Sequence, residues 1–285
     1  MIWEYRDNDA DPQLPVARFD SVSATHKSKL KDWLNFVQTG KHLLDRCKYC
    51  STELRILANK PGPYFEGRST ITLHHCSSCG WWAITWLGDG RSGPDGFFHL
   101  GRARGVLKNL DLSDISVPTN ELRQYLVAKY DDRFKVHPKK FEDIVGGIFS
   151  DFGYTVRVTA FSGDYGIDVV VLDGETGDTI GVQVKRYRDK IETEQIRSFA
   201  GALLLNGMTK GVFVTTSSFR SGVATTTKVF EGRAISIGLW DAGVFYDRLK
   251  LSQRQTYTNV EDPSAPFFAF WKEPSRIPTI IAESW

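Results

Sequence analysis

The stretch Gly163–Lys185 reads Gly-Asp-Tyr-Gly-Ile-Asp-Val-Val-Val-Leu-Asp-Gly-Glu-Thr-Gly-Asp-Thr-Ile-Gly-Val-Gln-Val-Lys. An apolar run from Ile167 to Leu172 and a second run that begins at Ile180 flank a segment of turn-forming residues, Asp173–Asp178. Apolar, β-branched runs on both sides of such a segment predict a β-hairpin.

The centre of this hairpin decides which side chains meet. With the centre between Glu175 and Thr176, residue 168 lies opposite residue 183. Opposed side chains share a face of the sheet, and side chains along a strand alternate between faces. We therefore expect Asp168, Gln183 and Lys185 to converge. This expectation depends on the pairing of the strands, because a register shifted by one residue would separate the three side chains. An acid, an amide and an ammonium at one place can hold a divalent cation beside a phosphate.

Helical and strand patterns surround the hairpin. Apolar residues at helical spacing predict a helix from Pro138 to Phe152, ended by Gly153. The other expected elements are helices over 121–130, 192–205, 221–230 and 242–251, and strands over 154–159, 211–216 and 234–237. This order of elements predicts an α/β fold with a mixed sheet flanked by helices on both faces.

The composition of the chain is that of a globular protein. Its 285 residues are 41% hydrophobic and 25% charged, with a net charge of only +2, so a nucleic-acid surface must be a local patch. The first residues lack a basic segment followed by an apolar one, and no run of about 18 apolar residues occurs. We expect a cytoplasmic protein that does not enter a membrane.

All four cysteines fall into two pairs, Cys47-x-x-Cys50 and Cys76-x-x-Cys79. Without a secretory signal, two such pairs predict a tetrahedral Zn²⁺ site rather than disulfides. The alternative is two redox-active or free thiol pairs. His74 and His75 precede the second pair and are further candidate ligands, although four cysteines complete the set.

The cysteine pairs define a small N-terminal domain. We expect residues 1–118 to contain a zinc module at about 41–88 that resembles a zinc ribbon or treble clef. Such modules serve as structural staples or as nucleic-acid readers, and both roles stay open. Residues 88–96 are rich in glycine and are expected to form a loop, either at a domain boundary or in a mobile hairpin. Residues 251–285 form a tail rich in proline and aromatic residues, which we expect to dock on a surface.

Residues 119–250 resemble the Mrr-type branch of the PD-(D/E)xK restriction-endonuclease superfamily. The stretches that carry the resemblance are Pro138–Glu142, Gly163–Asp168, Gly181–Lys185, Gly211–Ser217 and Ile235–Asp241. The resemblance implies a restriction-endonuclease-like fold. One departure is Asp164-Tyr165-Gly166, which replaces the family's common Asp-Gly-Gly.

The resemblance also implies a metal-dependent catalytic site. Asp168 and the main-chain carbonyl of Val184 would bind Mg²⁺ or Mn²⁺, and Glu142 would bind the ion directly or through water. Lys185 would orient or deprotonate the attacking water. Gln183 stands where most of the superfamily carries an acid, which predicts weaker metal binding.

Basic residues follow the hairpin. Between Gly181 and Arg233 there are nine Lys and Arg residues against four acids, so this region can attract phosphate. Arg186 and Arg188 are the candidate DNA-binding residues, although such a cluster is also compatible with a solvated strand end.

Three functions compete. The first is a metal-dependent DNA endonuclease of a restriction or anti-phage defence system, acting on modified or foreign DNA. The second is a catalytically weak or inactive nucleic-acid-binding or adaptor protein, and the third is a nuclease specific for junctions or RNA. The expected partners are DNA, a second copy of the chain in a homodimer, and other proteins of a defence system.

Overall fold

Two units divide the chain. The computed structural model describes residues 2–5, 44–62, 69–92, 95–159, 166–253, 260–277 and 279–283. Unit 1 comprises Met1–Lys108 together with Gln255–Trp285, and unit 2 comprises Asn109–Arg254.

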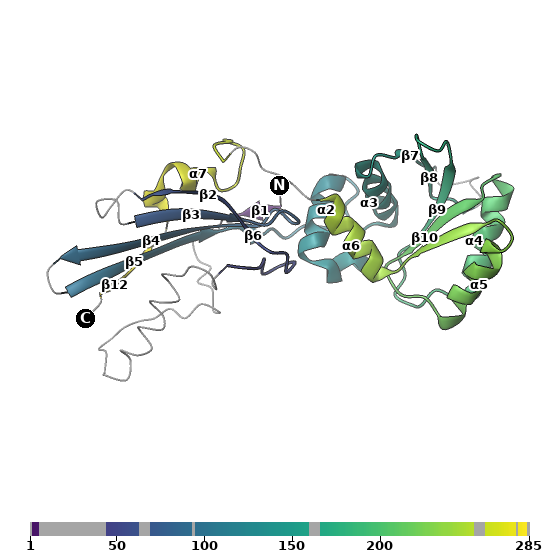
Figure 1. The fold of residues 1–285 in the computed structure, drawn as a ribbon, viewed down its shortest axis with the longest axis horizontal. Coiled ribbons are helices and arrows are strands. Elements are labelled where there is room, and N and C mark those ends of the chain that lie inside the picture. The colour runs from purple at the N-terminus through teal and green to yellow at the C-terminus, as the bar shows by residue number, and fades with distance from the viewer. Residues whose placement is uncertain are drawn as a thin grey trace. The chain divides into compact units, whose positions relative to one another are not determined.

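A mixed five-stranded sheet forms the centre of unit 2 (Figure 1). Its strands follow the spatial order β11-β10-β9-β8-β7. β9 is parallel to β10 and antiparallel to β8, and the outer pairs are β10 parallel to β11 and β7 antiparallel to β8. The strands are β7 (Thr155–Val158), β8 (Val169–Leu172), β9 (Thr179–Lys185), β10 (Lys210–Thr215) and β11 (Ser236–Trp240).

The β8–β9 hairpin has the predicted register. Val169 pairs with Val182 and Leu172 pairs with Thr179, so the hairpin is centred between Glu175 and Thr176. The turn closes through a hydrogen bond from the Asp173 N–H to the Asp178 carbonyl of 3.0 Å. Local turn chemistry thus sets the pairing of the two strands, and the expectation from the sequence is confirmed.

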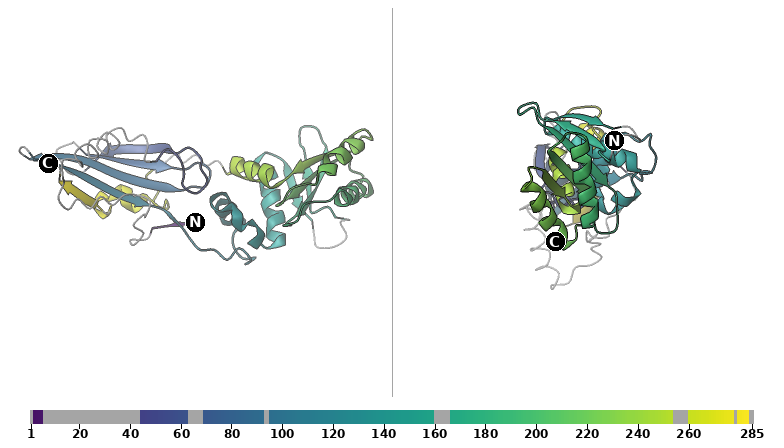
Figure 2. Two further views of the ribbon diagram at one scale, coloured as in Figure 1. Left: turned by 90° about the horizontal axis from the view of Figure 1, so that it is seen from below. Right: turned by 90° about the vertical axis from the view of Figure 1, so that its right-hand side faces the viewer.

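Helices cover both faces of this sheet. The views in Figures 1 and 2 show α4 and α5 on one face and α3 and α6 on the other. The helices of unit 2 are α2 (Thr119–Ala128), the 3₁₀ helix η1 (Tyr130–Lys135), α3 (Pro138–Asp151), α4 (Thr193–Leu205), α5 (Ser221–Glu231) and α6 (Ala242–Ser252). The predicted fold class, a mixed sheet flanked by helices, is therefore confirmed.

Two glycines allow α4 to lie close to the sheet. Gly181 and Gly211 are register partners on β9 and β10. A Cβ at Gly181 would lie 2.6 Å from the Leu203 side chain, and one at Gly211 would lie 2.7 Å from Leu203 and 2.8 Å from Phe199. Only hydrogen fits at these positions, so the close approach of α4 depends on both glycines.

Helix α3 has the predicted amphipathic pattern. Its N-cap is His137, whose Nδ1 accepts a hydrogen bond from the Lys139 N–H, and Pro138 occupies the first turn. Phe141, Ile144 and Ile148 are fully buried. The capped start and the buried stripe explain why this segment is helical and which side of it faces the core.

An antiparallel five-stranded sheet forms the body of unit 1, in the order β12-β5-β4-β3-β2. Its strands are β2 (Arg55–Pro61), β3 (Ser69–His75), β4 (Trp82–Ser92), β5 (Asp95–Arg104) and β12 (Thr279–Glu283), and a separate pair joins β1 (Trp3–Glu4) to β6 (Val106–Leu107). Of the glycine-rich residues 88–96, residues 88–92 and 95–96 are paired in the β4–β5 hairpin, in which Gly88 pairs with His99 and Ser92 pairs with Asp95. The predicted loop is thus wrong for most of this segment, because its backbone is paired across the hairpin, inside unit 1.

The C-terminal residues of unit 1 pack on the same sheet. Phe267, Phe270 and Trp271 are buried at the start and within the short helix α7 (Phe268–Lys272). The Phe270 ring lies 5.8 Å from the Trp82 ring, and the Lys60 ammonium lies 4.3 Å from the Trp271 ring centroid and also donates to the Trp271 carbonyl. After the 3₁₀ helix η2 (Pro274–Arg276), β12 pairs with β5.

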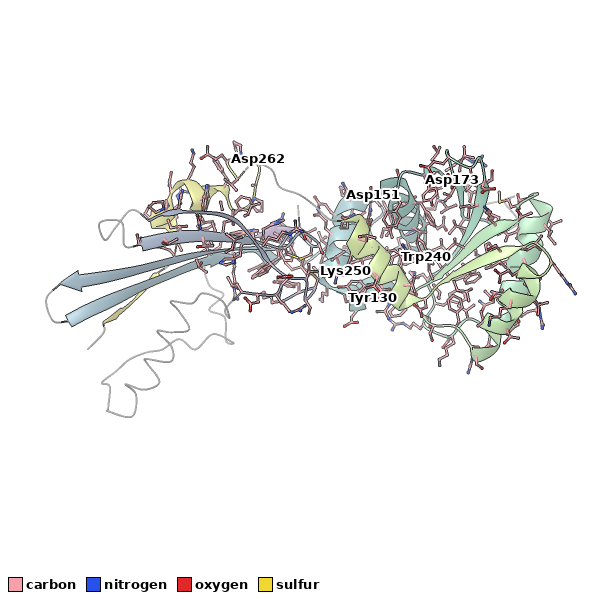
Figure 3. All side chains as sticks on the ribbon, in the orientation of Figure 1. Tyr130, Asp151, Asp173, Trp240, Lys250 and Asp262 are labelled. Carbon is pink, nitrogen blue, oxygen red and sulfur yellow. The ribbon has the colours of Figure 1, made fainter. Side chains whose placement is uncertain are left out.

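A hydrogen bond of Tyr130 links η1 to α6 in unit 2. The Tyr130 hydroxyl donates to the Ala242 carbonyl at 2.7 Å, and Tyr130 lies beside α6 (Figure 3).

Among the described residues, none of the helices is both long enough and apolar enough to span a bilayer.

Candidate functional site

Asp168 stands immediately before β8 and is held through its main chain from both sides. Its N–H donates to the Val182 carbonyl of β9 at 2.9 Å, and its carbonyl accepts from the Thr159 N–H at 2.9 Å. Thr159 Oγ1 also lies 2.9 Å from the Asp168 carbonyl and 2.8 Å from the Ile167 carbonyl. The position of Asp168 is therefore fixed by the ends of two neighbouring strands.

The Asp168 carboxylate faces β9. Its Oδ2 accepts a hydrogen bond of 2.6 Å from the Val184 N–H. A short bond from an amide to a carboxylate is a charge-assisted contact, which orients the carboxylate as well as stabilising its charge. The acid is thereby placed next to the Gln183–Lys185 segment, as the hairpin register predicts.

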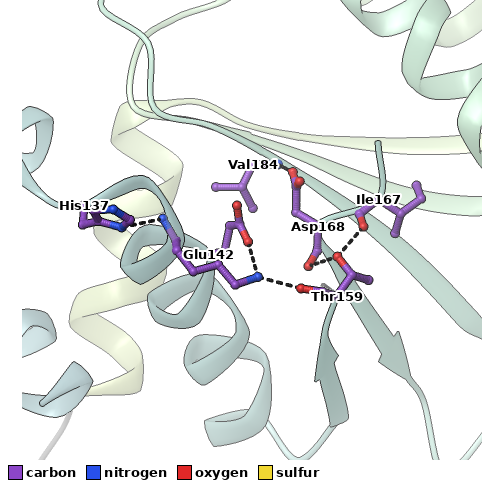
Figure 4. A network of polar contacts seen from close by, with 7 residues as sticks. His137, Glu142, Thr159, Ile167, Asp168 and Val184 are labelled. Atoms are coloured by element: carbon purple, nitrogen blue, oxygen red, sulfur yellow. Dashed lines mark hydrogen bonds and ion pairs between the residues drawn. The ribbon is translucent and has the colours of Figure 1, made fainter. Parts of the chain in front are cut away.

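Glu142 approaches the same place from helix α3 (Figure 4). Its Oε2 lies 2.8 Å from the Lys139 ammonium, which also donates to the Thr159 carbonyl at 2.6 Å. The side chains of Lys139 and Glu142 are 18% and 19% exposed, so the pair is largely shielded from water. Continuous polar contacts thus connect Glu142 through Lys139 and Thr159 to Asp168, and from there to Val184.

Gln183 and Lys185 lie on β9 on either side of Val184. The Gln183 Nε2 would be 3.2 Å from a Cβ at Gly166, whose φ of +89° favours glycine. The Lys185 ammonium lies 5.9 Å from the Tyr187 ring centroid. Both residues lie beside Val184, next to the predicted site. The network of hydrogen bonds described above joins Glu142, Asp168 and Val184. Residues 163–165, which carry the departure at Asp164 and Tyr165, lie outside the described residues.

Lys139 and Thr159 are members of this network that the sequence did not single out. Lys139 precedes Glu142 by three residues on a helix, a spacing at which opposite charges meet. Thr159 continues the β7–β8 ladder by one residue beyond Val158 and Val169, and so lies opposite Asp168. Both signals are readable in the sequence, but neither distinguishes a site residue from an ordinary ion pair or strand end.

The two candidate DNA-binding arginines differ in their surroundings. Arg186 donates a hydrogen bond from Nη1 to the Phe134 carbonyl of η1. Arg188 is exposed, and its guanidinium lies 4.4 Å from the Phe134 ring centroid. Arg186 therefore joins η1 to the end of β9, whereas Arg188 presents its charge to solvent.

The oxygen donors at this site fit a hard divalent cation. The carboxylates of Glu142 and Asp168 belong to one network with the main chain of Val184, and Mg²⁺ prefers carboxylate and carbonyl oxygen while it retains several waters. These residues would hold the ion by oxygen atoms alone, without sulfur or imidazole, which is the chemistry expected of a Mg²⁺ or Mn²⁺ site.

The four cysteines of unit 1 form a second candidate metal site. The ligand sulfurs of Cys47, Cys50, Cys76 and Cys79 all lie within 4.8 Å of one another, and all four residues are buried. Cys47 Sγ is 3.5 Å from Cys79 Sγ, and Cys50 Sγ is 3.4 Å from Cys76 Sγ, so none is bonded in a disulfide. Sulfurs at about 2.3 Å from a tetrahedral zinc lie roughly 3.8 Å apart, so the cluster fits Zn²⁺.

The cysteine cluster is shielded from water and is tied to β1. Burial raises the pKa of the Cys79 thiol, because a thiolate there lacks water. The Trp3 indole donates to the Cys79 carbonyl at 2.8 Å, which ties β1 to the second cysteine pair. His74 and His75, the alternative ligands, are not members of the cluster among the described residues.

Residues 134–248 match the family model described as Mrr_cat, restriction endonuclease. The match contains every residue of the network from Lys139 to Val184. Unit 2 contains an Mrr-type restriction-endonuclease domain. The resemblance seen in the sequence is thereby confirmed for this domain.

Known proteins similar to this chain include restriction enzymes. The "Type IV methyl-directed restriction enzyme EcoKMrr" of Escherichia coli (strain K12) is 32% identical over 110 residues, which cover 36% of this chain and 36% of that enzyme. The chain thus spans little more than a third of the length of this relative. Among solved structures, the "DNA modification-dependent restriction endonuclease AspBHI" is similar with a TM-score of 0.36 and 16% identity, over 51% of this chain and 39% of that one.

Proposed function

We propose that the Mrr-type domain is a metal-dependent DNA endonuclease that hydrolyses phosphodiester bonds in modified or foreign DNA. The observation that carries the proposal is the Asp168 carboxylate, which the Val184 N–H holds in place at 2.6 Å inside a network that includes Glu142. Two carboxylates positioned by different elements of an Mrr-type domain are the arrangement that this chemistry needs.

Each residue has a proposed task. Asp168, the Val184 carbonyl and Glu142 hold Mg²⁺ or Mn²⁺, which when bound supplies a Lewis acid for the phosphate and for water. Lys185 orients the attacking water or accepts its proton, and its positive charge stabilises the developing phosphate anion. Gln183 contributes an amide beside the ion without adding a negative charge.

The proposed substrate preference is based on the relative EcoKMrr. EcoKMrr is a methyl-directed enzyme, and we extend this preference to the present domain as a proposal. DNA that carries methylated bases is therefore the first substrate to test, with the same DNA unmethylated as its comparison.

The test uses purified, zinc-loaded protein with plasmid DNA in methylated and unmethylated form and with Mg²⁺ or Mn²⁺. We expect wild-type protein to cut, and Asp168→Ala and Lys185→Ala to lose cutting. Asp247→Ala is the matched control, because this carboxylate is exposed on α6. If neither form of the DNA is cut better by wild-type protein than by Asp168→Ala, the proposal is wrong.

A second function is favoured by one residue. The neutral amide of Gln183 lowers the negative charge available to a metal ion, which suits a nucleic-acid-binding or adaptor protein with a weak or inactive site. Salt-dependent DNA binding without metal-dependent cutting would support it. Junction and RNA substrates in the same assay distinguish the structure-specific alternative.

We also propose that the domain acts as a homodimer, since cutting both strands needs two sites and symmetric dimers are the commonest way to supply them. Light scattering of the protein with and without DNA measures this directly.

The Cys₄ cluster is proposed to bind a structural Zn²⁺. The zinc module would either only stabilise the fold or also contact DNA. The salt dependence of DNA binding, measured in variants of unit 1, distinguishes these two roles.

A further inference from the structure

One lysine of α3 contacts both Glu142 and Thr159, the residue that bonds to the main chain of Asp168. Lys139 lies in the first turn of α3, and its ammonium contacts Glu142 Oε2 at 2.8 Å and the Thr159 carbonyl at 2.6 Å. Glu142 is on α3, whereas Thr159 follows β7, so this single side chain spans from the helix to the strand end. With 18% exposure it makes both contacts largely out of water.

Thr159, the second partner of Lys139, contacts Asp168 directly. Thr159 donates from its N–H to the Asp168 carbonyl at 2.9 Å, and its hydroxyl lies 2.9 Å from the same oxygen. Asp168 in turn is fixed to β9 through the Val184 N–H. Lys139 therefore holds the Glu142 carboxylate in place relative to Asp168, through its contacts with Glu142 and Thr159. Figure 4 shows the labelled residues of this network.

We infer that Lys139 is a positioning residue that sets the Glu142 carboxylate for the divalent ion held by Asp168. The inference rests on the proposed function and deepens it. A glutamate side chain has several rotatable bonds, and holding it in one geometry opposes its conformational entropy. Partners that hold a metal ligand in this way typically change metal affinity by about 10- to 100-fold when they are removed.

The adjacent lysine offers a matched control. Lys140 has the same charge and lies in the same turn of α3, but its ammonium forms no hydrogen bond or ion pair with any described residue. A general effect of positive charge near the site would appear in both lysines. A positioning effect would appear only at Lys139.

The test measures Mn²⁺ binding by titration calorimetry to the zinc-loaded full chain, with Asp168→Asn to identify the site. We expect Lys139→Met to raise the dissociation constant about tenfold, Lys140→Met to leave it unchanged, and Lys139→Arg to recover part of the loss. In a Glu142→Gln background, Lys139→Met should add less than about a twofold effect, because the group that it positions is gone. Melting curves without Mn²⁺ show whether each variant is folded.

Three results would overturn the inference: unchanged or tighter Mn²⁺ binding in Lys139→Met, an equal loss in both backgrounds, or no Asp168-dependent binding in the wild-type chain. If Lys139→Met does not fold, the Lys139→Arg and Glu142→Gln cycle gives the same comparison. Failure of the proposed function has a different signature. In that case wild-type protein binds Mn²⁺ through Asp168 with the expected dependence on Lys139, and yet cuts no DNA.

Discussion

The Asp168 carboxylate accepts a 2.6 Å hydrogen bond from the Val184 N–H, and this contact joins the first residue before β8 to the strand that carries Gln183 and Lys185. The bond orients the acid without an additional side chain. Asp168 thus has two properties, its ability to accept this hydrogen bond and its negative charge. Different substitutions can test the two properties independently.

Replacement of Asp168 by asparagine should remove activity while preserving the fold. Asparagine keeps an acceptor oxygen for the Val184 N–H but has no negative charge for a metal ion. We expect cleavage to fall by about 100-fold or more, since even the loss of an indirect partner changes metal sites by about 10- to 100-fold. The melting temperature should change less than in Asp168→Ala, which also leaves the Val184 N–H without its acceptor. Equal destabilisation by the two variants would contradict this account.

Replacement of Gln183 by glutamate should strengthen metal binding. It adds a carboxylate on β9 beside Asp168, and an opposite charge near a cation is favourable by up to a few kcal/mol at about 4 Å near a protein surface. We expect the Mg²⁺ concentration for half-maximal cleavage to fall by roughly tenfold, equivalent to about 1.4 kcal/mol. Gln195→Glu on α4 is the control for added charge alone. An unchanged Mg²⁺ requirement would place Gln183 outside the ion's reach.

Removal of zinc should unfold unit 1. Four buried cysteines would surround the proposed ion, and zinc binding in small modules supplies about 10–16 kcal/mol of folding free energy. Treatment with a chelator, or Cys79→Ser, should release one zinc per chain and shift the fluorescence of Trp3 and Trp81, which are both buried. A colorimetric zinc assay and tryptophan fluorescence measure these changes. Zinc-free protein with unchanged fluorescence would argue against a structural ion.

Gly211→Ala should destabilise unit 2. The added Cβ would meet Leu203 at 2.7 Å and Phe199 at 2.8 Å, and overpacking of this kind costs about 1–3 kcal/mol. Gly238→Ala on the edge strand β11 is the matched control, because its nearest neighbour would be the Val212 side chain at 3.5 Å, an ordinary contact. Denaturant unfolding gives both free energies. Similar values for the two variants would mean that α4 adapts to the added methyl group.

Arg188→Ala should weaken DNA binding in a salt-dependent way. Its guanidinium is exposed beside Phe134, and loss of one phosphate contact lowers the slope of log affinity against log salt by about 1. Lys250→Ala, a basic residue of α6, is the control. The Arg186 guanidinium donates to the Phe134 carbonyl, so Arg186→Ala should lower the melting temperature more than Arg188→Ala does. Fluorescence anisotropy at several salt concentrations and thermal melts measure the two effects.

Much of unit 2 could be predicted because its signals are local. The turn Asp173–Asp178 sets the β8–β9 register, and His137 and Pro138 start α3, so each element follows from residues close to it in the sequence. The meeting of Asp168 with the Gln183–Lys185 strand follows from that register alone. The resemblance to Mrr-type domains added Glu142, whose helix approaches from elsewhere in the chain.

The remainder depended on contacts without a local signature. The Lys139 bridge requires the end of β7 to lie beside α3, which no pattern within either segment specifies. The difference between Arg186 and Arg188 arises from where η1 lies, because both residues have the same chemistry in the sequence. In unit 1, the pairing of β12 with β5 joins distant parts of the chain and could not be read from strand propensity.

The split of unit 1 around unit 2 has a consequence for biosynthesis. All residues of unit 2 are translated before Thr279–Glu283, the strand that completes the sheet at β5. Unit 2 can thus begin to fold on the nascent chain while the edge of β5 is still unpaired. A chain truncated after unit 2 would lack the strand that pairs with β5, and an unpaired strand edge is a site for aggregation and for recognition by chaperones.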